Sequence, residues 1–189
     1  MMKKIVTTLQ KMASGRVVLK LFILTMAVFS LMIMFTIPKV ESFASGIPLF
    51  DMSPAGYSYQ QAISLLESLG EDGRNVYLFQ QLPVDFVYPG LFAISYALLL
   101  TWLFAKSFAT NSKIFFLALV PVLGGFFDYL ENIGIIIMIN AFPNISQGLV
   151  AVVNIFTLLK SAFTTGFYIL LLVGIFYFII RKINMTTLQ

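Results

Sequence analysis

Four long apolar runs, separated by polar segments, set the pattern of this chain. They occupy residues 21–37, 85–104, 114–140 and 149–180. A helix needs about 20 apolar residues to cross the hydrocarbon core of a bilayer, and each run approaches or exceeds that length. The pattern therefore predicts an all-α integral membrane protein, a single domain built as a four-transmembrane-helix bundle.

A short basic segment, residues 1–20, precedes the first run and holds five Lys or Arg residues but no acid. A cleaved signal peptide is one interpretation, because Ser42-Phe43-Ala44 resembles a cleavage site. The apolar run is longer than the roughly 7–15 residues of a signal-peptide core, so we favour a retained first helix. The other three spans keep their orientation under either interpretation.

The polar segment 38–83 holds five of the eight acids and contains a predicted amphipathic helix at residues 58–69. Ser58 and Gln61 form the pattern of a capping box, apolar residues follow at helical spacing, and Gly70 is placed to end the helix before a turn. We expect this helix to lie on the membrane surface or to cap the bundle, with its apolar side facing the membrane.

Positive charge is unevenly distributed over the connections, and this predicts the topology. Apart from the first segment, the basic residues at predicted inner ends are Lys106, Lys113, Arg181 and Lys182. The other connections hold only Lys39 and Arg74. Because cytoplasmic loops carry the excess of Lys and Arg, both termini, including the tail 181–189, are expected in the cytoplasm. Residues 38–83 then form an extracytoplasmic first loop, and the expected location is a bacterial inner (plasma) membrane.

The composition narrows the chemistry. Hydrophobic residues make up 59% of the 189 residues and charged residues only 11%, against about 25% charged in soluble domains. The chain has no cysteine and no histidine, which excludes disulfides, iron–sulfur clusters and the usual haem and zinc ligands. The topology accounts for the net charge of +4, so no nucleic-acid partner is predicted.

The stretch Phe127–Asn132 places two carboxylates and a carboxamide inside the third apolar run. Ionisable groups at membrane depth are costly and normally face a protein interior or a water-filled cavity. At a rise of about 1.5 Å per residue, Asp128 lies roughly 22 Å and Glu131 roughly 27 Å from the basic inner end of their span. The same count puts Asp85 and Lys160 roughly 31 Å from theirs. All four fall in the outer third of an apolar core of about 30 Å, or at its boundary.

Helical spacing aligns polar residues on three of the spans. The shared faces hold Asp85, Tyr88 and Tyr96 on the second span, Gly124, Gly125, Asp128, Glu131 and Asn132 on the third, and Thr157, Lys160, Thr164 and Tyr168 on the fourth. The two glycines allow a neighbouring backbone to approach just below the acids. The apolar outer ends of the third and fourth spans should continue as a hairpin, which the helix at 58–69 is expected to cover.

These polar faces predict one outward-facing ligand site. Its residues are expected to be Arg74, Asp85, Tyr88, Asp128, Glu131, Asn132, Lys160 and Thr164. The alternative is a buried ion pair of Lys160 with Asp128 and Glu131 that only holds the bundle together. Three carboxylates and one lysine leave an excess of negative charge, which a proton, Arg74 or a bound cation should compensate. Asp85 also fits a helix N-cap, and Lys160 fits an anchor that reaches to the outer head groups.

A further pattern runs through residues 50–140. It consists of Gly56-Tyr57-Ser58, Leu69-Gly70-Glu71, Gly73-Arg74, Tyr77, Asp85 to Pro89, and Asp128-Tyr129-Leu130-Glu131-Asn132. This spacing resembles that of an uncharacterised family of small four-helix bacterial membrane proteins. The resemblance implies no activity, but it does imply that Arg74 joins the acids in one site.

The favoured function is binding or transport of a lipid, a small amphiphile or a cation, with membrane lipid and a small amphiphilic ligand as partners. A carrier with only four spans would require a homo-oligomer. No cofactor is required, although Asp85, Asp128 and Glu131 are hard oxygen donors that suit a divalent cation. A second hypothesis is an intramembrane enzyme acting on a lipid-borne substrate at the outer leaflet, with Asp128 and Glu131 as general acid and base. A third is an accessory or scaffold protein that docks a partner through its outer surface.

Overall fold

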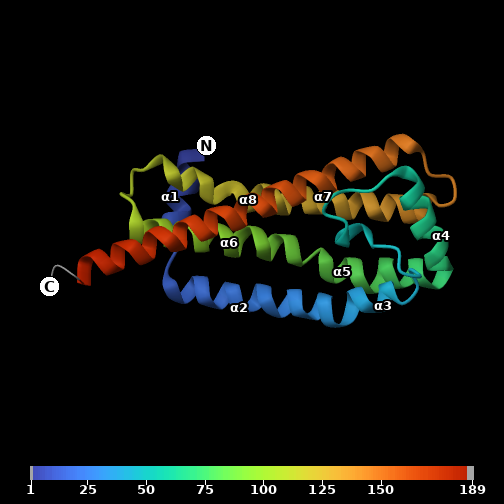
Figure 1. Ribbon diagram of the computed structural model, residues 1–189, viewed down its shortest axis with the longest axis horizontal. Coiled ribbons are helices and arrows are strands. Elements are labelled where there is room, and N and C mark those ends of the chain that lie inside the picture. Colours follow the sequence, from blue (N-terminus) through green and yellow to red (C-terminus); the bar gives the residue numbers. More distant parts are fainter. Residues whose placement is uncertain (1, 187–189) are drawn as a thin grey trace.

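The computed structural model describes residues 2–186, and this part of the chain is an elongated bundle of helices without strands (Figure 1). Four helical stretches in the described residues are long and apolar enough to cross a membrane. They are Gly15–Glu41, Tyr59–Ser107, Lys113–Ala141 and Gln147–Ile183. The all-helical class and the number of long apolar helices agree with the sequence prediction, and together they suggest a membrane protein.

The N-terminal segment forms two helices in place of one basic tail. α1 (Met2–Met12) buries Val6 against the rest of the protein. The side-chain amide of Gln10 donates a hydrogen bond to the backbone carbonyl of Thr110 at 2.8 Å. α2 (Gly15–Leu31) begins after Ser14, whose hydroxyl oxygen accepts from the amide of Val17. Because Ser14 caps the helix there, the first span begins six residues before the predicted position.

Two π-helical turns carry helices past the ends of the predicted polar segment 38–83, close to Pro38 and Pro83. Met32–Thr36 joins α2 to α3 (Ile37–Glu41), and Tyr77–Gln81 joins α4 (Tyr59–Val76) to α5 (Leu82–Asp85). Pro38 follows the first π turn and Pro83 follows the second. Proline removes an N–H donor and crowds the carbonyl four residues earlier, and the wider π ladder accommodates this without ending the helix. The two turns touch, because the Thr36 hydroxyl donates to the side-chain carbonyl of Gln81.

The predicted helix at residues 58–69 is the first part of α4. Its capping box is confirmed: the Gln61 amide donates to Ser58 Oγ at 3.2 Å, and the Ser58 amide donates to Gln61 Oε1 at 2.7 Å. Gly70 bends the helix with a φ of 61° and a ψ of −171°. The chain does not form the expected turn beyond Gly70, because helix resumes at Glu71 and leads into the π turn.

The remaining helices run alongside each other for much of their length. α6 (Tyr88–Ser107) is followed by a 3-10 helix (Lys113–Leu119), α7 (Val120–Ala141) and α8 (Gln147–Thr186). In Figure 1, α7 and α8 extend past α6 to the end of the molecule where α4 crosses over them. The expected hairpin and its cover are therefore present. α1 and the C-terminal part of α8 both lie toward the opposite end of the molecule.

Two apolar cores lie along the long axis. The first joins α4 to the α7–α8 hairpin and contains Leu66, Leu82, Ile135 and Val153. The second contains Phe92, Phe104, Phe115 and Phe167. A layer of polar residues falls between the two cores on three successive helical stretches. Along the sequence, Asp85 lies between Leu82 and Phe92, Asp128 between Phe115 and Ile135, and Lys160 between Val153 and Phe167.

Candidate functional site

Four acids and one lysine meet in this layer, and they come from separate parts of the chain. Asp85 is the last residue of α5, Asp128 and Glu131 lie one turn apart on α7, and Lys160 lies on α8. Asp51 comes from a short 3-10 helix, Phe50–Met52, in the connection between α3 and α4. The helices supply a fixed frame, and the connection adds one acid to it.

Lys160 is paired with two carboxylates of α7. Its Nζ lies 3.1 Å from Asp128 Oδ1 and 2.5 Å from Glu131 Oε2. The hydroxyl of Thr157 donates to the other oxygen of Glu131 at 2.6 Å. Glu131 is fully buried and both of its oxygens are bonded. The ion-pair arrangement expected from the sequence is therefore present, and it joins α7 to α8.

Asp85 and Asp51 lack such a cation. Asp85 Oδ2 and Asp51 Oδ1 are buried and, within residues 2–186, have no hydrogen-bond partner. The other oxygen of Asp51 accepts from the hydroxyl of Tyr77 at 2.8 Å. Unsatisfied carboxylate oxygens away from water are costly. Because one lysine already serves two acids, the site has an excess of carboxylates whose unpaired oxygens can accept a proton or a ligand donor.

Burial raises the pKa of Asp51 from its ordinary value to about 7, because the charged form loses water. The charge of Lys160 lowers this pKa, the charges of Glu131 and Asp128 raise it, and the hydrogen bond from Tyr77 lowers it. Asp51 is therefore expected to change protonation near neutral pH.

A cavity of about 140 Å³ opens beside these groups. Asp51, Asp85, Asp128 and Lys160 form its charged wall. Its apolar wall comes mainly from the first long helix and consists of Phe29, Met32, Ile33 and Ile37. Phe29 and Ile33 are also exposed on the outside of the bundle. The cavity thus combines an acidic interior with an apolar mouth on the helix face that a bilayer would cover.

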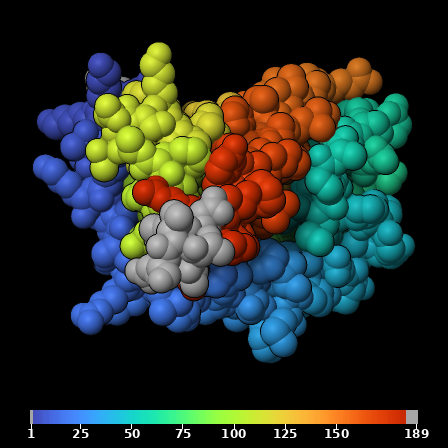
Figure 2. Space-filling model, turned by 60° about the vertical axis from the view of Figure 1, so that its left-hand side comes forward, coloured from blue at the N-terminus to red at the C-terminus, as the bar shows by residue number. Residues whose placement is uncertain are grey.

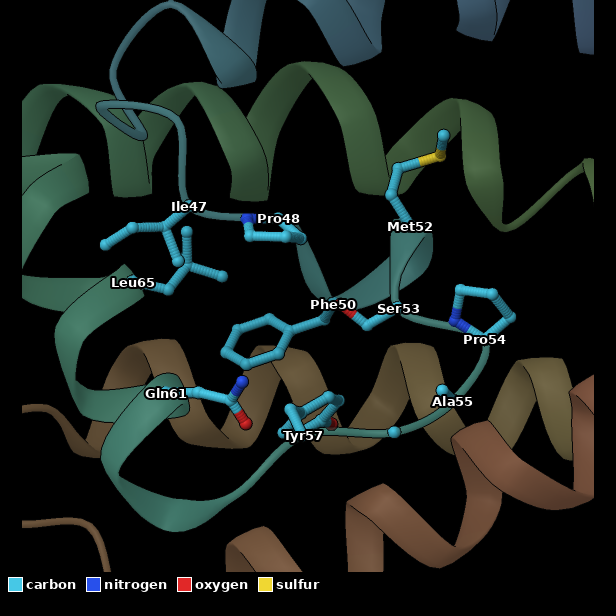
Figure 3. Close-up of a pocket in the computed structure, with 11 residues that line it drawn as sticks. Ile47, Pro48, Phe50, Met52, Ser53, Pro54, Ala55, Tyr57, Gln61 and Leu65 are labelled. Carbon is cyan, nitrogen blue, oxygen red and sulfur yellow. The ribbon is translucent and has the colours of Figure 1, made fainter.

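The Phe50–Met52 turn separates this cavity from a second one of about 240 Å³. Met52 lines both cavities, and Phe50 lines the second. Figure 3 shows the ring of Phe50 between Ile47, Gln61 and Tyr57, whereas the side chain of Met52 points away from them. One short turn therefore stands between the acids and a cavity enclosed by the 47–57 connection and α4.

The structure brings together most of the residues predicted for the ligand site. Those that line the cavity are Asp85, Tyr88, Asp128, Lys160 and Thr164. Glu131 and Asn132 lie behind this wall and are fully buried. The side-chain amide of Asn132 donates a hydrogen bond to the backbone carbonyl of Asp85 at 3.3 Å, at the break between α5 and α6. Ligand binding by these residues stays a prediction.

Arg74 is placed elsewhere, and the expectation that it completes the charge count is wrong. Its Nη1 donates to the carbonyl of Leu66 at 2.7 Å, and its guanidinium lies 4.6 Å from the ring centroid of Phe142. Within the described residues it forms no ion pair with an acid. Because the helix resumes after Gly70, Arg74 lies on α4 just beyond the bend, and its side chain reaches back across the bend to the carbonyl of Leu66.

Two other expectations are also corrected. Asp85 is not an N-cap, because α6 begins at Tyr88 with Val87 before it and no side chain caps it. In the described part of the chain, no group of three or more His, Cys, Asp or Glu side chains is arranged to hold a metal ion. The set Asp85, Asp128 and Glu131 does not form one because Glu131 turns toward Lys160 and Thr157.

Sequence reasoning missed Asp51 and Tyr77 as members of the site. Asp51 was placed in the polar outer segment, where no helical periodicity assigns it to a face. Tyr77 was noticed only as part of a spacing pattern. A signal did exist: five acids accompany only two basic residues between 38 and 83, which suggests that one of the acids is turned inward.

Four long apolar helices suggest a membrane protein, and the described helices enclose a layer that contains Asp85, Asp128, Glu131 and Lys160. Comparison of the chain with protein-family models, with curated proteins and with solved structures finds no match. The function is therefore argued from the geometry of the site.

Proposed function

We propose that this protein binds the positively charged head group of an amphiphile in the acidic cavity, at the outer side of a bacterial inner membrane. The observation that carries this proposal is the pair of buried, unbonded carboxylate oxygens, Asp51 Oδ1 and Asp85 Oδ2, at one small cavity. An ammonium group supplies N–H donors and a positive charge, which are what these oxygens lack.

The size and the walls of the cavity favour an amphiphile over a free solute. A volume of about 140 Å³ is small beside the roughly 300–1,000 Å³ of typical sites for drug-sized ligands, so it accommodates a head group and not a whole lipid. Phe29, Met32 and Ile33 line the mouth with apolar surface, and a hydrocarbon chain is expected to leave the cavity along them.

The placement of Glu131 weighs against the alternative of an acid and base pair. Glu131 is fully buried behind the cavity wall, and Lys160 and Thr157 bond both of its oxygens. A general acid or base must come within hydrogen-bond reach of the reacting group. The intramembrane-enzyme and scaffold hypotheses stay predictions with no specific support from this geometry.

Native mass spectrometry of the protein released from nanodiscs tests the proposal. The probes are oleylamine, oleyl alcohol and oleate, which share one hydrocarbon chain and differ in head-group charge. We expect oleylamine to be retained at least about tenfold better than oleyl alcohol, since a charge-assisted hydrogen bond contributes about 1.5–3 kcal/mol. Equal retention of all three probes, or preference for oleate through Lys160, would contradict the proposal.

A matched pair of variants assigns the binding to the cavity. Asp85→Asn removes the charge at an oxygen that has no partner, so folding should be preserved while oleylamine retention falls. Glu67→Gln makes the same chemical change at an exposed position on α4 and should leave retention unchanged. An equal loss in both variants would show that the amine binds through general surface charge.

A further inference from the structure

A large apolar groove lies far from the acids, between α2, α6 and α8. Its volume is about 720 Å³, within the roughly 300–1,000 Å³ range of small-molecule sites. Each helix supplies one side of the groove. The residues that line it include Leu19 and Phe22 of α2, Leu99 and Leu103 of α6, and Ile175 and Phe178 of α8. They recur at spacings of three and four on each helix, so each helix presents one continuous apolar face to the groove.

Close contacts with α6 explain why the groove exists. A Cβ atom at Gly174 would lie 2.6 Å from Leu103 Cδ2, so α8 comes very close to α6 at this point. A Cβ at Gly15 would lie 3.5 Å from Trp102 Nε1, so the start of α2 touches α6 as well. α6 therefore forms the floor, and α2 and α8 stand on either side of it with an open gap facing the bilayer.

Three basic residues lie next to residues that line one end of the groove, which we call its mouth. The ammonium of Lys106 lies 5.8 Å from the ring centroid of Trp102, which lines the groove. The guanidinium of Arg181 donates to the carbonyl of Lys106 at 3.0 Å. Arg16 follows Gly15 in the first turn of α2, where the helix dipole disfavours a positive charge. In Figure 2 this end of the molecule faces the viewer, with α1 and the start of α2 in blue and α8 in red.

The helices around this mouth provide no acidic side chain. The sequences of α1, α2, α6 and α8 contain no Asp or Glu, because all eight acids of the chain lie in other segments. The charge that complements Lys106, Arg181 and Arg16 must therefore come largely from outside these helices.

We infer that the groove is a binding site for an anionic phospholipid, whose acyl chain lies between α2 and α8 and whose phosphate meets Arg16, Lys106 and Arg181. An acyl chain matches a groove walled almost entirely by aliphatic and aromatic side chains. Basic residues beside an apolar groove between membrane helices recognise anionic head groups. A second copy of this chain fits less well, because pairing by a two-fold axis would bring the same basic mouth against itself.

The test is lipid retention by the whole protein in native mass spectrometry after release from nanodiscs that contain equal amounts of phosphatidylglycerol and phosphatidylcholine. We expect phosphatidylglycerol to be retained at least about tenfold better. The double variant Arg16→Gln/Lys106→Gln should lose this preference, whereas Lys39→Gln, a change at an exposed lysine in the last turn of α3, should keep it.

Filling the groove provides an independent measurement. Leu19 is exposed at the groove, so Leu19→Trp is expected to fold and to lower retention of both lipids severalfold. Leu24→Trp places the same side chain on an exposed position of α2 that does not line the groove, and retention should be unchanged. The inference is overturned by equal retention of both lipids in the wild type, or by a loss in Lys39→Gln as large as in the double variant. A dimer that Leu19→Trp abolishes would also overturn it, because the occupant would then be a second copy.

Discussion

The acidic layer depends on Lys160, because Lys160 forms ion pairs with both Asp128 and Glu131. Removing one partner of a buried ion pair leaves an uncompensated charge and costs about 3–5 kcal/mol. Lys160→Met is therefore expected to lower the free energy of unfolding by about that amount, as measured by chemical denaturation in detergent micelles. Lys39→Met, at an exposed position, should have little effect.

A second substitution tells a charge effect from a packing effect. Lys160→Met strands two carboxylates, Asp128 and the fully buried Glu131. The double variant Lys160→Met/Glu131→Gln removes the charge of Glu131 and should recover part of the lost stability. If the double variant were as unstable as Lys160→Met, the loss would come from packing of the lysine side chain and not from the unpaired carboxylate.

Asp51 predicts a specific pH dependence. Its pKa is raised from 3.8 to about 7 in the folded protein, so between these values the folded state binds more protons than the unfolded state. Stability from this group is then greatest at low pH and falls as the pH rises toward about 7. The melting temperature of the wild type should fall more between pH 5 and pH 8 than that of Asp51→Asn.

The titratable groups around Asp51 are Tyr77, Lys160, Glu131, Asp128 and Asp85, so the comparison with Asp51→Asn is needed to isolate its share of the pH dependence. Asp72→Asn serves as the control, because Asp72 is exposed on α4. If the pH dependence of Asp51→Asn matched that of the wild type, Asp51 would not titrate in this range.

At the scale of the elements, close approach of α6 and α7 sets the position of the acids. A Cβ at Gly125 would lie 2.5 Å from the backbone oxygen of Pro89, and a backbone atom cannot give way as a flexible side chain can. Gly125→Ala is expected to cost about 1–3 kcal/mol of stability, the usual penalty for overpacking. Thermal unfolding in detergent measures this change.

Gly166→Ala is the matched control on α8. A Cβ at Gly166 would lie 3.7 Å from Val120 Cγ1, which is ordinary van der Waals contact. Because Ala is favoured over Gly in a helix interior by roughly 0.5–1 kcal/mol, this variant should be neutral or slightly more stable. Equal effects of the two substitutions would contradict the close approach of α6 and α7 at Gly125.

At this scale, helices could be predicted where an apolar pattern extended over many residues, whereas the residues at which helices begin and end could not. The capping box at Ser58 follows from local rules and the structure has it, whereas the helix end predicted at Gly70 is a bend beyond which the helix resumes. Pro38 and Pro83 misled us because proline usually ends a helix, whereas here a π turn precedes each of them. The position of Arg74 was also predicted wrongly, because it depends on the part of α4 that resumes after the bend at Gly70.

At the scale of the whole molecule, the distribution of basic residues predicts which ends face the cytoplasm. The chain has no cysteine, so single cysteines can be introduced without background. Lys3→Cys and Lys113→Cys are expected to react with a membrane-impermeant maleimide only from the cytoplasmic side. Glu67→Cys should react only from the opposite side, and labelling of all three from one side would contradict this topology.

The convergence of Asp85, Asp128 and Lys160 on one level could be predicted by counting helical rise, because long helices hold their register over many turns. The cavity at that level could not be predicted. It depends on Asp51, which a connection of irregular structure carries into the bundle, and on an apolar wall from the first helix. Side-chain direction in a connection follows from packing between distant segments and has no periodic signal in the sequence.

The dissociation constant of oleylamine for the protein in nanodiscs tests the central claim most directly, with wild type, Asp85→Asn and Glu67→Gln compared at pH 8. A cation is bound more tightly when the facing carboxyl is ionised, so affinity in the wild type should rise between pH 6 and pH 8. We expect Asp85→Asn to weaken binding about 10- to 100-fold, and Glu67→Gln to leave it unchanged. Equal dissociation constants in all three proteins would contradict a head-group site at the acidic cavity.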